Sequence, residues 1–170
     1  MAEKAGWRHW GRGWALVLVV VVVVLDQWTK TLASSLLTYA QPVEILPVFD
    51  LTLLHNRGAA FSFLSEAGGW QRWFFSGLAA TVSVVLVVWL WRLPRKQWLL
   101  SLALALILGG ALGNLWDRIL LGHVVDFISL HYGGRYFPAF NLADSAITLG
   151  AVLMLLDMVI NAEKKADEQS

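Results

Sequence analysis

Residues 73–91 form a run of nineteen consecutive residues without a charged side chain. As a helix with a rise of about 1.5 Å per residue, this run would be roughly 29 Å long, which is about the thickness of a bilayer's hydrocarbon core. The whole chain of 170 residues is 58% hydrophobic and only 15% charged, with a mean hydropathy of +0.61. A soluble domain of this size carries more charge on its surface, and a disordered chain contains far fewer apolar residues. The sequence therefore predicts a membrane protein.

Three other segments are similarly long and apolar. We expect an all-α polytopic membrane protein with four transmembrane helices, over about residues 14–37, 73–91, 97–116 and 138–160. Two of the connecting segments have β character. Phe49–Leu53 alternates apolar and polar residues, as in a half-buried strand, and Gly133-Gly134 separates two β-rich stretches, as in a hairpin turn. We predict a small β platform on the outer face, within a single membrane-embedded domain covering residues 1–170.

The distribution of basic residues predicts the orientation. Eight of the thirteen lysines and arginines lie in the two terminal tails and the short 92–96 turn, which four spans place on one side of the membrane. Because cytoplasmic segments are enriched in basic residues, we expect both termini in the cytoplasm. All ten tryptophans fall near the ends of the expected spans, where their rings favour the headgroup region. The first span also resembles a cleaved signal peptide, but Asp26 and Lys30 follow its apolar core directly and no small-x-small cleavage site comes after them.

Several classes of chemistry are disfavoured. The chain has no cysteine, which excludes disulfides, thiol nucleophiles, zinc–thiolate sites and iron–sulfur clusters. Its net charge of +1, without a basic stripe, does not favour nucleic acid as a partner. His55, His123 and His131 lack the helical pairing of zinc hydrolases, and neither a Gly-x-Ser-x-Gly motif nor a phosphate-binding glycine loop is present. We expect no metal and no cofactor.

The polar residues of the spans gather at their outer ends. Because ionisable groups inside a membrane cost free energy, their positions indicate function. A proton or ion pathway would require polar groups through the full depth of the membrane, so this asymmetry favours chemistry at the outer interface over transport. The residues concerned are Asp26, Lys30, Asn56, Asn114, Asp117, Arg118, Asp126, Asn141 and Asp144.

Some of these residues have a simple structural explanation. Asp26 and Lys30 are spaced i,i+4 with the acid first, which favours an ion pair at a helix end that fixes depth and register. A role for Lys30 as general base to a serine is disfavoured, because no nearby serine lies in a recognisable nucleophile motif. The small residues Gly109, Gly110 and Gly113 predict a close helix–helix contact.

For other residues the structural and functional interpretations remain open. Asp117 and Arg118 fit an interfacial polar cap, and Arg118 equally fits a fork of donors directed at a substrate carbonyl or headgroup. Asn141 and Asp144 fit the cap and first turn of a helix. Capping does not explain Asp126, which lies in an apolar loop leading to the same helix.

Two aspartates at one membrane face, without metal ligands around them, suggest an aspartic protease. Two close carboxylates cannot both ionise cheaply, so they share a proton. The ionised carboxylate then takes a proton from a bound water, and the other donates one to the carbonyl oxygen or the leaving amine.

At these residues the sequence resembles bacterial signal peptidase II, the lipoprotein signal peptidase. The resemblance extends over nearly the whole chain, and no departure appears within its motifs. It rests on five ordered blocks, at residues Asp26–Lys30, Asn56–Phe61, Gly109–Arg118, Gly122–Phe127 and Phe140–Ile147.

The resemblance implies a four-span aspartic endopeptidase of the bacterial inner membrane, with its active site near the periplasmic face. Such an enzyme cleaves diacylglyceryl-modified prolipoproteins on the amino side of the lipid-bearing cysteine, and it is inhibited by globomycin-type cyclic peptides. Its catalytic pair corresponds to Asp126 and Asp144. The positions implied to bind substrate are Asn56, Gly58, Asn114, Arg118 and Asn141, and those implied to support them are Asp26, Lys30 and Asp117. The glycine-containing segment Asn56–Phe61 is expected to supply backbone donors or a flexible lip, and the phospholipid bilayer surrounds the whole.

Two alternatives come from other functional classes. A small transporter or ion-coupled carrier predicts polar residues near mid-bilayer, where the sequence has only the glycines of the third span. A non-catalytic assembly factor that binds lipidated partners predicts that replacing the two aspartates has no effect.

Overall fold

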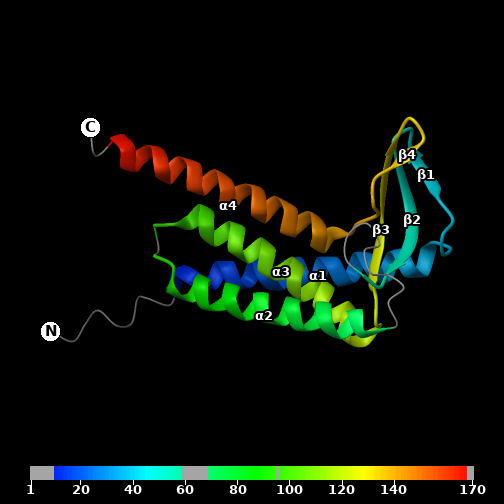
Figure 1. Ribbon diagram of the computed structural model, residues 1–170, viewed down its shortest axis with the longest axis horizontal. Coiled ribbons are helices and arrows are strands. Elements are labelled where there is room, and N and C mark those ends of the chain that lie inside the picture. The colour runs from blue at the N-terminus through cyan, green and yellow to red at the C-terminus, as the bar shows by residue number, and fades with distance from the viewer. Residues whose placement is uncertain (1–9, 59–68, 95, 168–170) are drawn as a thin grey trace.

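In a computed structural model, which describes residues 10–58, 69–94 and 96–167, four helices form a bundle with a small sheet at one end (Figure 1). The helices are α1 (Trp10–Leu36), α2 (Trp70–Arg92), α3 (Trp98–Leu120) and α4 (Leu142–Asp167). All four are long and apolar enough to cross a membrane, which confirms the predicted number of spans. The first residues of α1 and the last of α4 lie at the end of the bundle opposite the sheet (Figure 1).

The outer surface of the bundle is apolar, as a lipid-facing surface must be. Val17, Val20 and Val24 of α1 are more than half exposed, as are Val84 and Val85 of α2. In a soluble protein such a surface would cause aggregation, whereas lipid tails solvate it. The valine-rich stretch of α1 is therefore accounted for by contact with the membrane.

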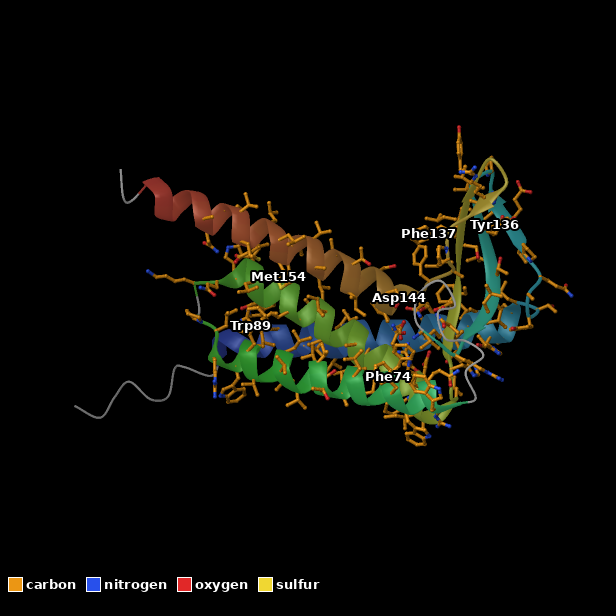
Figure 2. All side chains as sticks on the ribbon, in the orientation of Figure 1. Phe74, Trp89, Tyr136, Phe137, Asp144 and Met154 are labelled. Atoms are coloured by element: carbon orange, nitrogen blue, oxygen red, sulfur yellow. The ribbon has the colours of Figure 1, made fainter. Side chains whose placement is uncertain are left out.

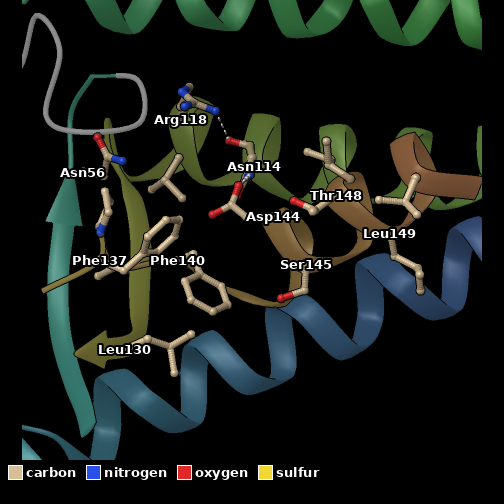
Figure 3. Close-up of a pocket in the computed structure, with 15 residues that line it drawn as sticks. Asn56, Asn114, Arg118, Leu130, Phe137, Phe140, Asp144, Ser145, Thr148 and Leu149 are labelled. Carbon is tan, nitrogen blue, oxygen red and sulfur yellow. Dashed lines mark hydrogen bonds between the residues drawn. The ribbon is translucent and has the colours of Figure 1, made fainter. Parts of the chain in front are cut away.

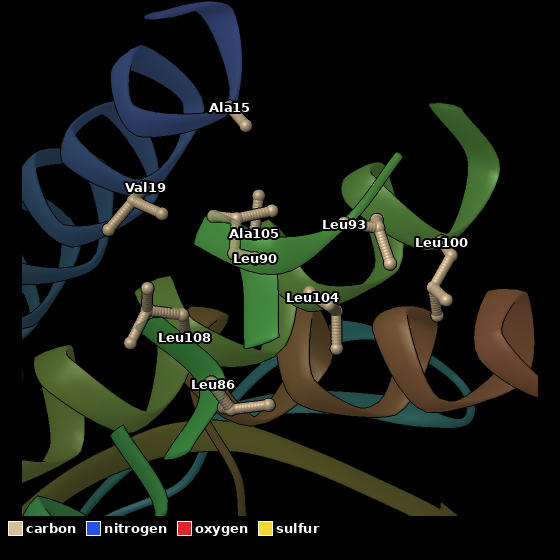
Figure 4. Close-up of a cluster of buried hydrophobic side chains, with 9 residues drawn as sticks. All are labelled: Ala15, Val19, Leu86, Leu90, Leu93, Leu100, Leu104, Ala105 and Leu108. Atoms are coloured by element: carbon tan, nitrogen blue, oxygen red, sulfur yellow. The ribbon is translucent and has the colours of Figure 1, made fainter. Parts of the chain in front are cut away.

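Helix α3 is the centre of the bundle, because it packs against each of the other three helices. Its residues Leu104 and Ala105 have no exposed surface. Around them, side chains of α1, α2 and α3 form a buried apolar cluster at the end of the bundle away from the sheet (Figure 4). The members of this cluster are Ala15, Val19, Leu86, Leu90, Leu93, Leu100, Leu104, Ala105 and Leu108.

The predicted glycine face of α3 is confirmed as a close helix–helix contact. A Cβ at Gly110 would collide with the carbonyl oxygen of Ala143 and with the side chain of Ile147 on α4. A Cβ at Gly113 would lie 2.6 Å from Oδ2 of Asp26 on α1. Small residues thus let α3 approach both neighbours at the level where the polar residues gather.

The sheet has four antiparallel strands in the order β1-β2-β3-β4. They are β1 (Val43–Leu46), β2 (Phe49–Asn56), β3 (Val124–Tyr132) and β4 (Arg135–Tyr136). Both predicted β features are confirmed, since Phe49–Leu53 belongs to β2 and Gly133-Gly134 forms the turn between β3 and β4. The short strand β1, all of whose residues are exposed, was not predicted.

Several helix ends differ from the predicted spans, and two of these differences affect the polar residues. Helix α3 continues four residues beyond Trp116, so Asp117 is buried within the helix instead of capping its end. Helix α4 begins at Leu142 and not near Pro138, because the preceding segment pairs with β3. The backbone of Phe140 exchanges hydrogen bonds with that of Ile128, and the Phe137 N–H donates to the carbonyl of Leu130.

Parts of the predicted features lie outside the described residues. These are Lys4 and Arg8 of the N-terminal tail, Arg95 of the turn between α2 and α3, and residues 59–61 of the glycine-containing segment.

Candidate active site

The polar residues singled out in the sequence meet where the sheet joins the helices. Asp144 lies at the start of α4, at the sheet end of the bundle, and Trp89 lies toward the opposite end (Figure 2). Asp126 lies in β3, two residues after its start, and is 2% exposed. The remaining members come from α1, from the outer end of α3, from the end of β2 and, for Asn141, from the residue before α4.

Asn141 joins the two aspartates. Its side-chain Nδ2 donates to Asp126 Oδ1 at 2.8 Å, and its backbone N–H donates to Asp144 Oδ2 at 3.3 Å. Its Oδ1 in turn accepts the backbone N–H of Asp144 at 2.9 Å. This reciprocal pair of bonds is a capping box, so the predicted helix cap is confirmed. Asn141 therefore binds the carboxyl groups of both Asp126 and Asp144 and keeps them on the same side of the bundle.

Two further asparagines complete the hydrogen bonding of the pair. Asn114 of α3 donates from Nδ2 to Asp144 Oδ1 at 2.7 Å, while its Oδ1 accepts from Asn141 Nδ2 at 3.2 Å. Asn56, at the end of β2, donates from Nδ2 to Asp126 Oδ2 at 3.1 Å. Each carboxyl group therefore accepts two hydrogen bonds from neutral donors, which fix its orientation without neutralising it.

The setting of Asp126 favours its protonated form. Burial raises the pKa of Asp126 from 3.8 to about 7, and the negative charge of Asp144 adds to the increase. Hydrogen bonds from Asn56 and Asn141 and the positive charge of Lys30 act in the opposite direction but do not cancel it. Asp126 therefore holds its proton below about pH 7, beside the negative charge of Asp144.

Below the pair lies a buried ionic cluster around Lys30. The Nζ of Lys30 lies 2.8 Å from Asp26 Oδ2 and 2.9 Å from Asp117 Oδ2, and it donates to Asn114 Oδ1 at 2.9 Å. All three donors of the ammonium group are thus used, and none of the three charged residues is more than 3% exposed. The predicted ion pair of Asp26 and Lys30 is confirmed, but it is buried within α1 and does not lie at a helix end.

The ionic cluster extends to the backbone beside Asp126 and Asp144. Asp26 Oδ1 accepts the N–H of Ala143, next to Asp144, at 2.9 Å. Asp117 Oδ2 accepts the N–H of Val125, next to Asp126, at 3.1 Å. Gln27, which the sequence did not single out, donates from Nε2 to Asp117 Oδ1 at 2.8 Å and to Asp26 Oδ2 at 3.2 Å. One cluster therefore positions both aspartates.

Arg118 lies over the pair without bonding either carboxylate directly. The charges of Asp144, Asp126 and Asp117 all act on its guanidinium, and its Cζ lies 5.6 Å from the ring centre of Phe75 on α2. Its Nη2 lies 3.4 Å from the carbonyl oxygen of Gly58. The Gly58 N–H donates to Asn56 Oδ1 at 3.0 Å, so the backbone donor expected at Gly58 is engaged within the protein.

A second arginine, Arg72, binds the backbone of Arg118. It was not identified from the sequence. Arg72 of α2 donates from Nε to the carbonyl oxygen of Arg118 at 2.7 Å and from Nη2 to that of Ile119. These are carbonyls of the last turn of α3, which lack partners within the helix and carry its negative dipole. In the sequence, Arg72 stands just before the charge-free run 73–91, and nothing there indicates this contact.

Beside the pair is a cavity of about 700 Å³, which we call the membrane cavity (Figure 3). Most of its lining is apolar, including Ile147, Leu149 and Val152 along α4, and its polar members are Asn56, Asn114, Arg118, Asp144, Ser145 and Thr148. Within residues 10–58, 69–94 and 96–167, no group of three or more His, Asp or Glu side chains is arranged to hold a metal ion. Carboxyl, amide, hydroxyl and guanidinium groups line the cavity.

The chain was compared with known proteins. The family model for signal peptidase (SPase) II matches residues 18–160. The chain is 63% identical over 142 residues to the lipoprotein signal peptidase of Acinetobacter baumannii, covering 84% of this chain and 81% of that one. It is 57% identical over 155 residues to the lipoprotein signal peptidase of Ectopseudomonas mendocina, covering 90% and 91%. A bacterial membrane enzyme solved by the in meso method at 2.3 Å superposes with a TM-score of 0.81 at 32% identity, covering 90% of this chain and 92% of that one.

Proposed function

Because this chain belongs to the signal peptidase II family, we propose that it hydrolyses lipoprotein precursors with Asp126 and Asp144 as its catalytic pair. Family membership itself makes the chain a multi-pass bacterial membrane protease that removes signal peptides from lipoproteins. The observation that carries the assignment of the pair is the set of bonds from Asn141, which holds the two carboxyl groups together at the edge of an apolar cavity.

The proposed reaction uses one proton shared by the pair. The ionised carboxyl group takes a proton from a bound water, whose oxygen attacks the scissile carbonyl carbon, while the protonated carboxyl group donates to the carbonyl oxygen. Collapse of the tetrahedral intermediate breaks the C–N bond, and the leaving amine takes a proton from the pair. The pair ends with one proton, as it began, and no cofactor is required.

The proposed substrate is a diacylglyceryl-modified prolipoprotein, cleaved on the amino side of the lipidated cysteine. The shape of the membrane cavity supports this choice, since it runs from Asp144 along α4 with an apolar lining suited to acyl chains or an apolar signal peptide. We assign substrate positioning to Arg118 and Asn56, with Asn114, Asn141 and Gly58 holding the site around them. Lys30, Asp26 and Asp117 are assigned a supporting role.

We further propose that the enzyme lies in the inner membrane with both termini cytoplasmic and the pair near the periplasmic face. The basic residues and the common side of the α1 and α4 ends support this orientation. A globomycin-type cyclic peptide would compete with the substrate at the same site.

The test replaces each aspartate of the pair by asparagine. Purified enzyme is incubated with one diacylglyceryl-modified precursor, and cleavage is followed by gel shift and by the mass of the released peptide. We expect Asp126→Asn and Asp144→Asn to lower kcat by about 10²- to 10⁴-fold, as loss of a general acid or base does. Asp157→Asn is the matched control, since Asp157 is a buried acid near the other end of α4, bonded to Asn161 at 2.8 Å. Full activity in either variant of the pair would support the assembly-factor alternative and refute the assignment.

A further inference from the structure

A second cavity, of about 650 Å³, lies on the other side of the pair, against the sheet. We call it the sheet cavity. Asp126 belongs to its lining, as Asp144 does to that of the membrane cavity. The two cavities share Asn56 and the segment 137–139, so they adjoin at the carboxyl groups. A chain with its scissile bond at the pair therefore has one flank in each cavity.

Strands β2 and β3 border the sheet cavity. Alternation along β2 puts Leu54 and Asn56 on the same side, while Thr52 lies within a register shift between Leu51 and Leu54 and lines the same cavity. The antiparallel register pairs Leu54 with Asp126, and directly paired residues share a face. Asp126 thus belongs to a row of side chains that all line the cavity.

The chemistry of this cavity differs from that of the membrane cavity. Polar groups make up a larger share of its lining than of the membrane cavity's, and they include the hydroxyls of Thr52 and Ser129, the imidazole of His55 and the guanidinium of Arg57. All its lining residues lie outside the candidate spans, in segments 39–57 and 126–139. The cavity therefore suits a hydrated polypeptide and not an acyl chain.

Thr52 supplies an independent observation. It is 7% exposed, and its buried Oγ1 has no hydrogen-bond partner within the part of the chain that the structure describes. A buried hydroxyl without a partner costs free energy, and a sheet interior would accept valine at the same volume. The hydroxyl is explained if a ligand in the cavity completes its bonding. Ser129, 4% exposed, lines the cavity from the neighbouring strand β3.

From these observations we propose that the sheet cavity binds the polypeptide on the carboxyl side of the scissile bond, that is, the first residues of the mature lipoprotein after the lipidated cysteine. Thr52 and Ser129 hydrogen-bond its main chain in an extended conformation. This inference rests on the proposed function and adds a binding site for the mature segment. Both the signal peptide and the lipid of the precursor are apolar and belong in the membrane cavity, so the soluble mature segment is the part left for the polar side.

The test uses two lipidated precursors that share a signal peptide. One ends with an amide directly after the lipidated cysteine, and the other continues for six mature residues. The wild-type enzyme is expected to cleave the longer precursor with a higher kcat/KM. Thr52→Val and Ser129→Ala should each lower kcat/KM for the longer precursor by about 3- to 10-fold, mainly through KM, and leave the shorter one unchanged, since each removes one hydrogen bond.

The controls separate this inference from the proposed function and from folding. Thr31→Val makes the same chemical change at an exposed site on α1 and should change kcat/KM for neither precursor. Thr52→Val should melt no lower than wild type, because it removes a hydroxyl without a partner. Asp126→Asn should abolish cleavage of both precursors, and if it does not, the proposed function fails whatever Thr52 does. Equal losses on both precursors, a loss confined to the shorter one, no loss on either, or no length preference in the wild type would each overturn the inference.

Discussion

Asp126 is the residue whose charge the fold changes most clearly. Its pKa is raised to about 7, by burial first and by the charge of Asp144 second. Below that pH Asp126 retains its proton, and above it the proton is lost. A mechanism that needs one proton on the pair therefore weakens as the pH rises through about 7.

The pH profile of kcat/KM tests this. We expect activity to fall about tenfold per pH unit above the raised pKa. The Asn56 hydrogen bond lowers that pKa, so Asn56→Ala should move the alkaline limb to higher pH in addition to lowering the rate. Rates are measured from pH 5 to 9 on the lipidated precursor, in buffers of constant ionic strength. They give the alkaline limb of the wild type and that of the variant. A limb that moves to lower pH in the variant would contradict this account of Asp126.

Lys30 shows how strongly one residue supports the site. Its ammonium group is the counter-charge of two buried carboxylates. Lys30→Met would leave both uncompensated, at a cost of about 3–5 kcal/mol. We expect a lower melting temperature and a loss of activity. Tryptophan fluorescence measures the melting temperature. Adding Asp26→Asn should recover part of the stability by removing one of the two charges. A single variant as stable as wild type would show that the ion pairs do not hold the elements together.

At the scale of helices, the contact between α3 and α4 determines where Asp144 lies. Gly110 faces the first turn of α4, where a Cβ would collide with the Ala143 carbonyl oxygen. Gly110→Ala should push α4 away at the residue preceding Asp144, costing about 1–3 kcal/mol and at least tenfold in activity. Gly77→Ala on α2 is the matched control, because a Cβ there meets nothing within 4 Å. Melting curves and kcat for the two variants decide, and equal behaviour would refute the contact.

The elements were largely predictable where their cause is local. A charge-free run of membrane length identifies α2 and α3, shorter apolar runs identify α1 and α4, and alternation identifies β2. The start of α4 was missed because Pro138 reads locally as a helix start, whereas the backbone of Phe140 bonds to β3, which depends on tertiary pairing. The outer end of α3 was missed for a similar reason, since Asp117 looks like a charged terminus until Lys30 of α1 neutralises it.

The candidate site was predictable in its membership but not in its connections. The sequence drew attention to Asp126 because capping did not explain it, and the family resemblance, now confirmed, implied the pair. That Asn141 both caps α4 and holds both carboxyl groups follows only from the pairing of the segment before α4 with β3. Gln27 and Arg72 were missed because a polar residue at a helix position gives no sign of a partner 46 or 90 residues away.

For the molecule as a whole, chemistry and packing are separated along the bundle. The buried apolar cluster lies away from the sheet. The buried charges of Asp26, Lys30 and Asp117 lie at the end of the bundle next to the sheet. In the membrane, this arrangement puts the reacting groups at one boundary and leaves the middle of the bundle apolar, as expected for a hydrolase that acts at the surface.

The orientation can be tested with single cysteines, because the chain has none of its own. Arg135→Cys in β4 and Lys96→Cys in the turn before α3 both replace exposed residues. In intact spheroplasts, a membrane-impermeant maleimide should label the first, and it should label the second only after the membrane is permeabilised. The opposite pattern would place the sheet in the cytoplasm and refute the proposed topology.

The capping box at Asn141 limits which residues can replace it. At most helix starts aspartate, serine and asparagine substitute for one another with little loss. Here an aspartate would still start the helix but would add a third negative charge between two acids that already compete for one proton, and a serine lacks an amide to reach Asp126. Residues that replace one another at most helix starts therefore cannot do so at position 141, because the side chain there must also donate a hydrogen bond to Asp126.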